Sequence, residues 1–269
     1  DMEYTFVVNG WQSLDISFTA EHMFQEYGRV KEIHYAKDPE SLIWFITDEG
    51  NLIGCTFDPA NNVIGWHRHP TNGKVISGCV MTHNGTASLW LLIDRRCGSA
   101  TKTLFVERTS PLSMMDSKVG LHYAVDRTAI EGFKHLANHL VWVTVDGVQA
   151  DDVTLDANGD GTASISGKLI EVGLQYNSKM VTLPTDIPVK GGTGMSHIKR
   201  FNKIYSRLYD SYPPVINSNQ TTVAASPFSG DVNVTHLGWT TDAENIMEMN
   251  APFKCKISGI FGEAEENKR

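Results

Sequence analysis

The sequence predicts an all-β protein, because short apolar runs alternate with turn residues along most of the chain. Three such runs, residues 42–47, 52–57 and 63–67, lie between Tyr35 and His69. Turn residues such as Gly, Pro, Asn and Asp separate them. Because connections this short cannot make a parallel crossover, we expect neighbouring runs to pair as an antiparallel meander.

A second meander of similar size follows directly. Its runs are residues 75–83, 86–94 and 103–107, with turns at Asn84-Gly85 and at residues 97–99. Two consecutive small sheets must bury their faces against one another, which predicts radially packed, propeller-like blades. An ordinary β-sandwich is the alternative.

Very little helix is expected. Residues 20–27 form the one clear candidate, with Thr19 as its N-terminal cap and Gly28 at its end. We expect residues 22–24 to supply its buried contacts.

The character of the chain changes near Asp126. Short strands are predicted at residues 140–145, 148–155, 162–165 and 169–174. This series predicts a small inserted β-barrel or sandwich domain, which ends in a Pro- and Gly-rich stretch. The expected organisation is propeller-like blades in residues 1–125, the small β-domain in 126–192, and a β-rich part in 193–269 that packs back on the blades.

In the C-terminal part, residues 196–209, 230–237 and 253–261 are predicted as strands, and the charged tail 263–269 is expected to fray. The chain also starts abruptly with a strand-like run near Tyr4, so we expect it to be a fragment of a longer protein. No apolar run is long enough for a membrane span, and no signal peptide is evident, so we expect a soluble chain.

Charge and cysteine content restrict the function. A net charge of -8 argues against a protein whose main task is to grip nucleic acid by its phosphates, although DNA could still slide past such a surface. The four cysteines form no C-x-x-C pair, which argues against a zinc or redox motif. Cys55 and Cys79 lie in apolar runs and are expected to be buried free thiols, in keeping with assembly in a reducing cytoplasm.

Three motifs with metal-binding character are weak. Residues 156–161 match half of a calcium loop, but the twelfth position is Gly167 instead of an acid, so a polar hairpin turn is preferred. His135 and His139 lack the Glu of a zinc protease motif. His67 and His69 share a strand face and could chelate a metal, but no third ligand stands nearby in sequence.

Packing at a blade edge is therefore the preferred interpretation of His67 and His69, and Trp66 and Arg68 are expected on the opposite strand face. No nucleophile elbow, phosphate loop or paired acid motif occurs. We therefore predict that the protein is not an enzyme, and we assign no catalytic, cofactor-binding or metal residues.

One segment is concentrated in basic residues. On a strand, Lys199, Phe201, Lys203, Tyr205 and Arg207 would share one face. Such a face could contact DNA phosphates, a neighbouring subunit or only solvent. The candidate contact residues are Lys199, Arg200, Lys203 and Arg207.

Short motifs along the whole chain resemble the tail nozzle proteins of short-tailed bacteriophages, also called tail tubular protein B or phage stabilisation proteins. The motifs include Gly65-Trp66-His67-Arg68-His69 and Val145-Asp146-Gly147. Others lie, in the expected order, at residues 38–44, 50–52, 56–57, 131–136, 172–176, 207–211, 229–232, 238–239 and 251–257.

The resemblance implies a structural virion protein, assembled in the host cytoplasm. Six copies would form the distal tube of the tail, below an adaptor ring, retain and conduct the genomic DNA, and offer sites for fibres or spikes. It implies a β-rich fold with propeller-like blades, no cofactor and no catalytic residues. A carbohydrate-binding or glycan-depolymerising tail module is the alternative, and exposed tryptophan rings at a blade edge would favour it.

Overall fold

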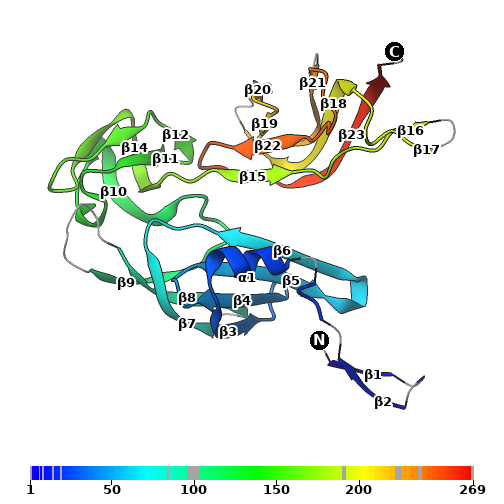
Figure 1. The fold of residues 1–269 in the computed structure, drawn as a ribbon. Coiled ribbons are helices and arrows are strands. Elements are labelled where there is room, and N and C mark those ends of the chain that lie inside the picture. The colour runs from blue at the N-terminus through cyan, green and yellow to red at the C-terminus, as the bar shows by residue number, and fades with distance from the viewer. Residues whose placement is uncertain are drawn as a thin grey trace. The chain divides into compact units, whose positions relative to one another are not determined.

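The structure, a computed structural model, describes residues 2–5, 7, 9–13, 15–18, 20–83, 85–95, 103–189, 192–221, 226–235 and 238–267. Antiparallel strands dominate this part of the chain, and α1 (Glu21–Tyr27) is its one α-helix (Figure 1). The predicted all-β class is confirmed.

The chain divides into two compact units that interleave along the sequence. The first contains Asp1–Ser117, Ile130–His139 and Thr154–Gly161, and the second contains Lys118–Ala129, Leu140–Val153 and Thr162–Arg269. Residue 126, where a domain boundary is predicted, lies inside the long strand β10 (Asp116–Ile130).

The first unit contains the two predicted meanders. The first sheet has the order β3-β4-β5-β6, and the second has the order β7-β8-β9. Their bounds are β3 (Val30–Ala36), β4 (Leu42–Thr47), β5 (Leu52–Asp58), β6 (Val63–His69), β7 (Lys74–His83), β8 (Thr86–Asp94) and β9 (Leu104–Arg108). A separate hairpin joins β1 (Met2–Thr5) to β2 (Gly10–Ser13). The predicted turn at residues 97–99 lies outside the described residues.

One apolar core joins the two sheets. Trp44, Ile46 and Leu52 of the first sheet cluster with Leu89, Leu91 and Ile93 of the second. Neighbouring propeller blades and the two sheets of a sandwich both pack in this way. The described strands close neither a propeller ring nor a barrel.

The helix α1 covers part of the opposite face of the first sheet. Phe24 lies edge-on to Phe45 and Trp66, with ring centroids 5.6 and 5.5 Å apart, and Arg68 stacks on Tyr27 at 4.6 Å. None of the helical residues is fully buried. The expected contacts of residues 22–24 are therefore met only in part: Met23 and Phe24 are half-buried, whereas His22 is exposed, because a short helix keeps its outer side in solvent. Thr19, the predicted cap, lies outside the described residues.

The small β-domain is one open sheet of order β10-β14-β11-β12, with β13 paired to β11. Its further strands are β11 (Leu140–Val145), β12 (Val148–Gln149), β13 (Val153–Thr154) and β14 (Gly161–Leu174). The strands predicted at 162–165 and 169–174 are one strand. The Asp146-Gly147 turn explains this. The Asp146 carboxylate accepts hydrogen bonds from the backbone N–H groups of Lys168 and Leu169, so the backbone stays extended between the two predicted strands.

The C-terminal part has two sheets that share a core. One has the order β15-β22-β19-β20, the other β21-β18-β23, and Ile204, Leu208 and Met247 lie between them. Their bounds are β15 (Ser178–Val181), β18 (Lys199–Ser211), β19 (Val215–Ile216), β20 (Asn219–Gln220), β21 (Phe228–Thr235), β22 (Ile246–Met249) and β23 (Ile257–Glu266). A two-stranded ribbon pairs β16 (Pro188–Val189) with β17 (Gly192–Thr193).

The charged tail does not fray as expected, because residues up to Glu266 belong to β23. Glu263 pairs with Lys203, Glu265 with Arg200 and Glu266 with Lys199 across the ladder to β18. An acidic segment here lies opposite the basic one, and opposite charges in cross-strand positions stabilise the pairing.

Candidate functional sites

The basic strand β18 does not present its five alternating residues on one face. A β-bulge interrupts its pairing with β23 between Phe201 and Lys203. Since a one-residue bulge reverses the alternation, Lys199 and Phe201 lie on the core side, whereas Lys203, Tyr205 and Arg207 face outward. The prediction of a single shared face is therefore wrong.

Lys199 cannot contact a partner at the surface, because its side chain is 0% exposed. Its ammonium donates hydrogen bonds to the carbonyl oxygens of Gly194 at 3.1 Å and Met195 at 3.2 Å. These contacts satisfy a buried cation without a carboxylate. Of the four predicted contact residues, Arg200, Lys203 and Arg207 remain accessible.

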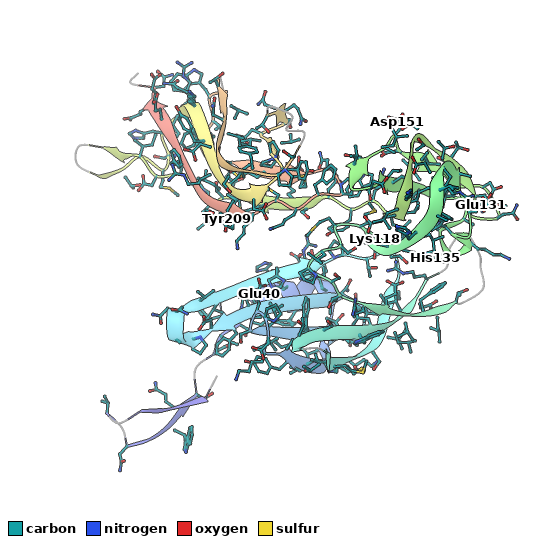
Figure 2. All side chains as sticks on the ribbon, turned by 180° about the vertical axis from the view of Figure 1, so that it is seen from behind. Glu40, Lys118, Glu131, His135, Asp151 and Tyr209 are labelled. Atoms are coloured by element: carbon teal, nitrogen blue, oxygen red, sulfur yellow. The ribbon has the colours of Figure 1, made fainter. Side chains whose placement is uncertain are left out.

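The outward face of β18 is a ladder of cations and rings. Tyr205 stacks on Phe261 with centroids 5.2 Å apart and an interplanar angle of 9°. Lys203 lies over Tyr205 at 4.7 Å, and Arg207 lies over Phe261 at 5.3 Å. Tyr209, labelled in Figure 2, continues this exposed face. The rings orient the cations, which makes this a structured surface.

Acidic partners neutralise much of this ladder. Arg207 makes two hydrogen bonds to the Asp231 carboxylate, at 2.8 and 2.9 Å, and these hold the pKa of Asp231 below its usual range. Hydrogen bonds from Asn202 and Arg200 lower the pKa of Glu265 in the same way. A face whose cations are already paired offers a phosphate backbone little net charge.

A second surface is apolar. The face of the β7-β8-β9 sheet that points away from the shared core carries Met81, Trp90, Leu92, Leu104 and Val106. Val106 is 70% exposed, and Met81 and Leu104 are also exposed. Arg108 lies over the Trp90 ring at 5.8 Å. We call this surface the outer apolar face; contiguous exposed apolar residues of this kind mark interaction sites.

Cys79 belongs to the outer apolar face, because it pairs directly with Trp90. It is exposed, so the prediction that it is buried is wrong; an apolar run has two faces, and only one faces this core. Cys55 is buried as predicted, Cys255 is partly buried, and Cys97 lies outside the described residues. Burial raises the pKa of Cys255 to about 11.

His67 and His69 share one face of β6, as predicted, and bond to each other. Nδ1 of His67 lies 2.6 Å from Nε2 of His69, and Nε2 of His67 lies 3.3 Å from the Thr56 hydroxyl. The His69 ring packs edge-on to Trp44, with centroids 4.8 Å apart. Gly54 makes room for this arrangement, because a Cβ there would collide with the His67 ring.

The environment disfavours protonation of both imidazoles. Burial lowers the pKa of the half-buried His67; His69 is exposed at its surface, but desolvation where its ring packs on Trp44, together with repulsion from His67, lowers its pKa to about 4. The described residues contain no group of three or more side chains placed to hold a metal ion. The pair is therefore best described as packing at the edge of the sheet, with Trp66 and Arg68 on the opposite face against α1.

The other two candidate motifs are local structure. His135 (Figure 2) lies in a short 3-10 helix, where its Nε2 is 3.4 Å from the Ser117 carbonyl oxygen, and burial lowers its pKa. In the 156–161 loop, the Asp156 carboxylate accepts hydrogen bonds from the backbone N–H groups of Asn158 and Asp160. The predicted polar turn is present.

Sequence reasoning missed a buried ionic cluster around Arg95, which is 1% exposed. Its guanidinium donates to Glu107 at 2.5 and 2.7 Å, to Asp116 at 2.7 and 3.1 Å, and to the Asn72 carbonyl oxygen at 2.8 Å. The hydrogen bonds to Glu107 and Asp116 keep the pKa of Arg95 above its usual value despite burial. The partners are far apart in sequence, so no spacing identifies them.

Comparisons with known proteins add no relative: no protein-family model matches the chain, and no curated protein matches it in sequence. Among the described residues, no helix has both the length and the apolar character needed to cross a membrane. The functional assignment therefore rests on the surfaces described above and on the ordered motifs of the sequence.

Proposed function

We propose that the protein is a structural component of a short phage tail. Six copies form part of the distal tube, below the adaptor ring, and the tube retains the genomic DNA, conducts it during ejection and carries fibres or spikes. The ordered sequence motifs support this role, and the all-β architecture agrees with it. Such a role in the virion requires surfaces for assembly and no catalytic site.

The outer apolar face is the observation that carries the proposal. A folded chain that leaves Met81, Leu104 and Val106 exposed beside Trp90 has apolar surface that a monomer in water does not use. The proposed occupant is a neighbouring copy of the same chain, because a ring of identical subunits covers such a face in every copy at once.

Charge supports the same role. The chain carries a net charge of -8, and the cations on the exposed side of β18 are paired or stacked with their neighbours. A conduit with a negative wall avoids the counterion release that would make DNA bind tightly. In the proposed tube, acidic side chains face the channel and the β18 ladder packs against a neighbouring subunit.

Two matched substitutions test the use of the outer apolar face. Val106 and Val125 are both 70% exposed on strands, but only Val106 lies on this face. Val106→Asp places a charge in the proposed contact and weakens assembly by about tenfold or more, whereas Val125→Asp leaves assembly unchanged. Native mass spectrometry over a concentration series measures both variants. Equal behaviour of the two variants would contradict the proposal.

A further inference from the structure

A shallow groove of about 310 Å³ lies in the C-terminal part. The residues that matter for recognition are Trp239, Asn217, Asn219, Glu244 and Asn245. The volume is at the lower end of the range of small-ligand pockets, about 300–1,000 Å³. An aromatic ring, amides and a carboxylate meet here within one part of the chain.

The ring is fixed in place and still accessible. Trp239 is 46% exposed, and the Arg200 guanidinium stacks over it at 4.7 Å. Arg200 also bonds Glu265 at 3.1 Å, which holds the guanidinium at the ring. The part of the Trp239 ring that stays exposed is flat and apolar, and it is available for contact with a ligand.

A chain of hydrogen bonds leaves one donor unused. The backbone N–H of Ile246 donates to Oδ1 of Asn217 at 2.7 Å, so Nδ2 of Asn217 donates to Oδ1 of Asn245 at 3.1 Å. This order fixes the amide orientation of Asn245, whose Nδ2 finds no acceptor within the described part of the chain. Asn245 is only 4% exposed, but its Nδ2 is not fully buried, so this unused donor can reach a ligand or a bound water in the groove.

Glu244 adds an acceptor to the lining of the groove. Glu244 is exposed, and its carboxylate has no hydrogen-bond or ion-pair partner among the described residues. The next residue before it, Ala243, is buried with φ +49°, a left-handed conformation that a residue with a Cβ rarely adopts. The Thr185 hydroxyl holds it by donating to its carbonyl oxygen at 3.0 Å.

From these contacts we infer that the groove binds a neutral pyranose sugar. The C–H face of the sugar ring lies on Trp239, and its hydroxyl groups accept from Nδ2 of Asn245 and donate to the Glu244 carboxylate. The carboxylate repels phosphates and acidic sugars, which selects a neutral ring. The inference does not depend on the tail role, since all residues of the groove belong to one copy of the chain.

Saturation-transfer NMR on the full chain tests this directly. The probes are methyl α-glucoside, methyl α-mannoside and methyl β-galactoside, and a single sugar in a shallow groove is expected to bind with Kd of about 1 mM. We expect transfer to the ring C–H protons of at least one glycoside. Trp239→Ala reduces the affinity about tenfold or more, and Trp239→Phe keeps most of it.

Two further variants separate recognition from folding. Glu244→Ala changes an exposed side chain and weakens glycoside binding several-fold without loss of structure. Trp11→Ala, at an exposed tryptophan elsewhere in the chain, leaves the glycoside affinity unchanged. The inference is overturned if the wild type gives no transfer to any of the three glycosides, or if Trp239→Ala binds as well as the wild type. Binding of dAMP in place of the sugars, lost in Trp239→Ala, would also overturn it and identify a base-stacking site.

Discussion

The imidazoles of His67 and His69 show how the fold fixes a protonation state at single residues. Their bond requires one ring nitrogen to donate and the other to accept. If both rings carry a proton on each nitrogen, no acceptor remains and two positive charges lie side by side. At least one of the two rings is therefore neutral in the packing at the edge of β6.

The stability of the fold is expected to decrease as the pH is lowered, because of the His67–His69 pair. The unfolded chain titrates near pH 6.5, whereas the pKa values of both folded rings are lower and that of His69 is about 4. The unfolded state therefore binds more protons between about pH 6.5 and pH 4, so the stability present above pH 6.5 is lost as the pH falls through this window. Because His69 keeps part of its surface in solvent, the loss is roughly 1 kcal/mol.

Thermal unfolding at pH 7 and pH 5 measures this loss. The variant His69→Gln, which cannot gain a proton, should show a smaller fall in melting temperature between the two pH values than the wild type. His22, an exposed histidine on α1, provides the control, since His22→Gln should leave the fall unchanged. An identical pH dependence in the wild type and His69→Gln would show that the pair is not responsible.

At the scale of elements, Arg95 connects β8, β9 and the first residue of β10. It follows β8 directly and binds Glu107 of β9 and Asp116 at the start of β10. Thr71, which lies in the turn before β7, also donates a hydrogen bond to Asp116, so this turn is connected to the cluster as well. The cluster fixes where the second meander ends and where the chain leaves it.

Removing this cation is expected to destabilise the protein strongly. Arg95→Met leaves two partly buried carboxylates without their partner and should cost about 3–5 kcal/mol in the free energy of unfolding. Arg207→Met removes an arginine that is also bidentate to a carboxylate, but at the surface, where solvent screens the pair, so it should cost far less. Urea denaturation compares them, and equal costs would contradict a special role for the buried cluster.

Strand β18 shows which features of an element the sequence predicts and which it does not. Alternation of apolar and polar residues locates this strand, and apolar runs bounded by turn residues locate β4, β8 and β11 with their observed bounds. The bulge after Phe201 cannot be read from that alternation, because it depends on how β23 pairs with its neighbour. The sequence therefore predicts where the strand lies, but it does not predict which side of the sheet Lys199 faces.

The same limit applies to the acidic tail and to Cys79. The tail looks like a solvated end when read alone, and it becomes a strand only because a basic partner lies across the ladder. Cys79 lies in an apolar run, but the run belongs to a sheet with two apolar faces. Local sequence patterns identify strands, whereas the partner strand or subunit decides which face is buried.

At the scale of the whole molecule, two differently built exposed faces support an assembled protein. The outer apolar face exposes apolar side chains that a second protein surface would bury, and the β18 ladder presents oriented rings and paired charges. Assembly through such faces agrees with the proposed tail role.

A cryo-electron microscopy map of the assembled tail tests the central proposal most directly. We expect six copies around the channel, with the outer apolar face against a neighbouring copy, the β18 ladder at a subunit contact, and acidic side chains along the channel wall. A map in which Val106 faces solvent, or in which Lys203 and Arg207 line the channel, would contradict it.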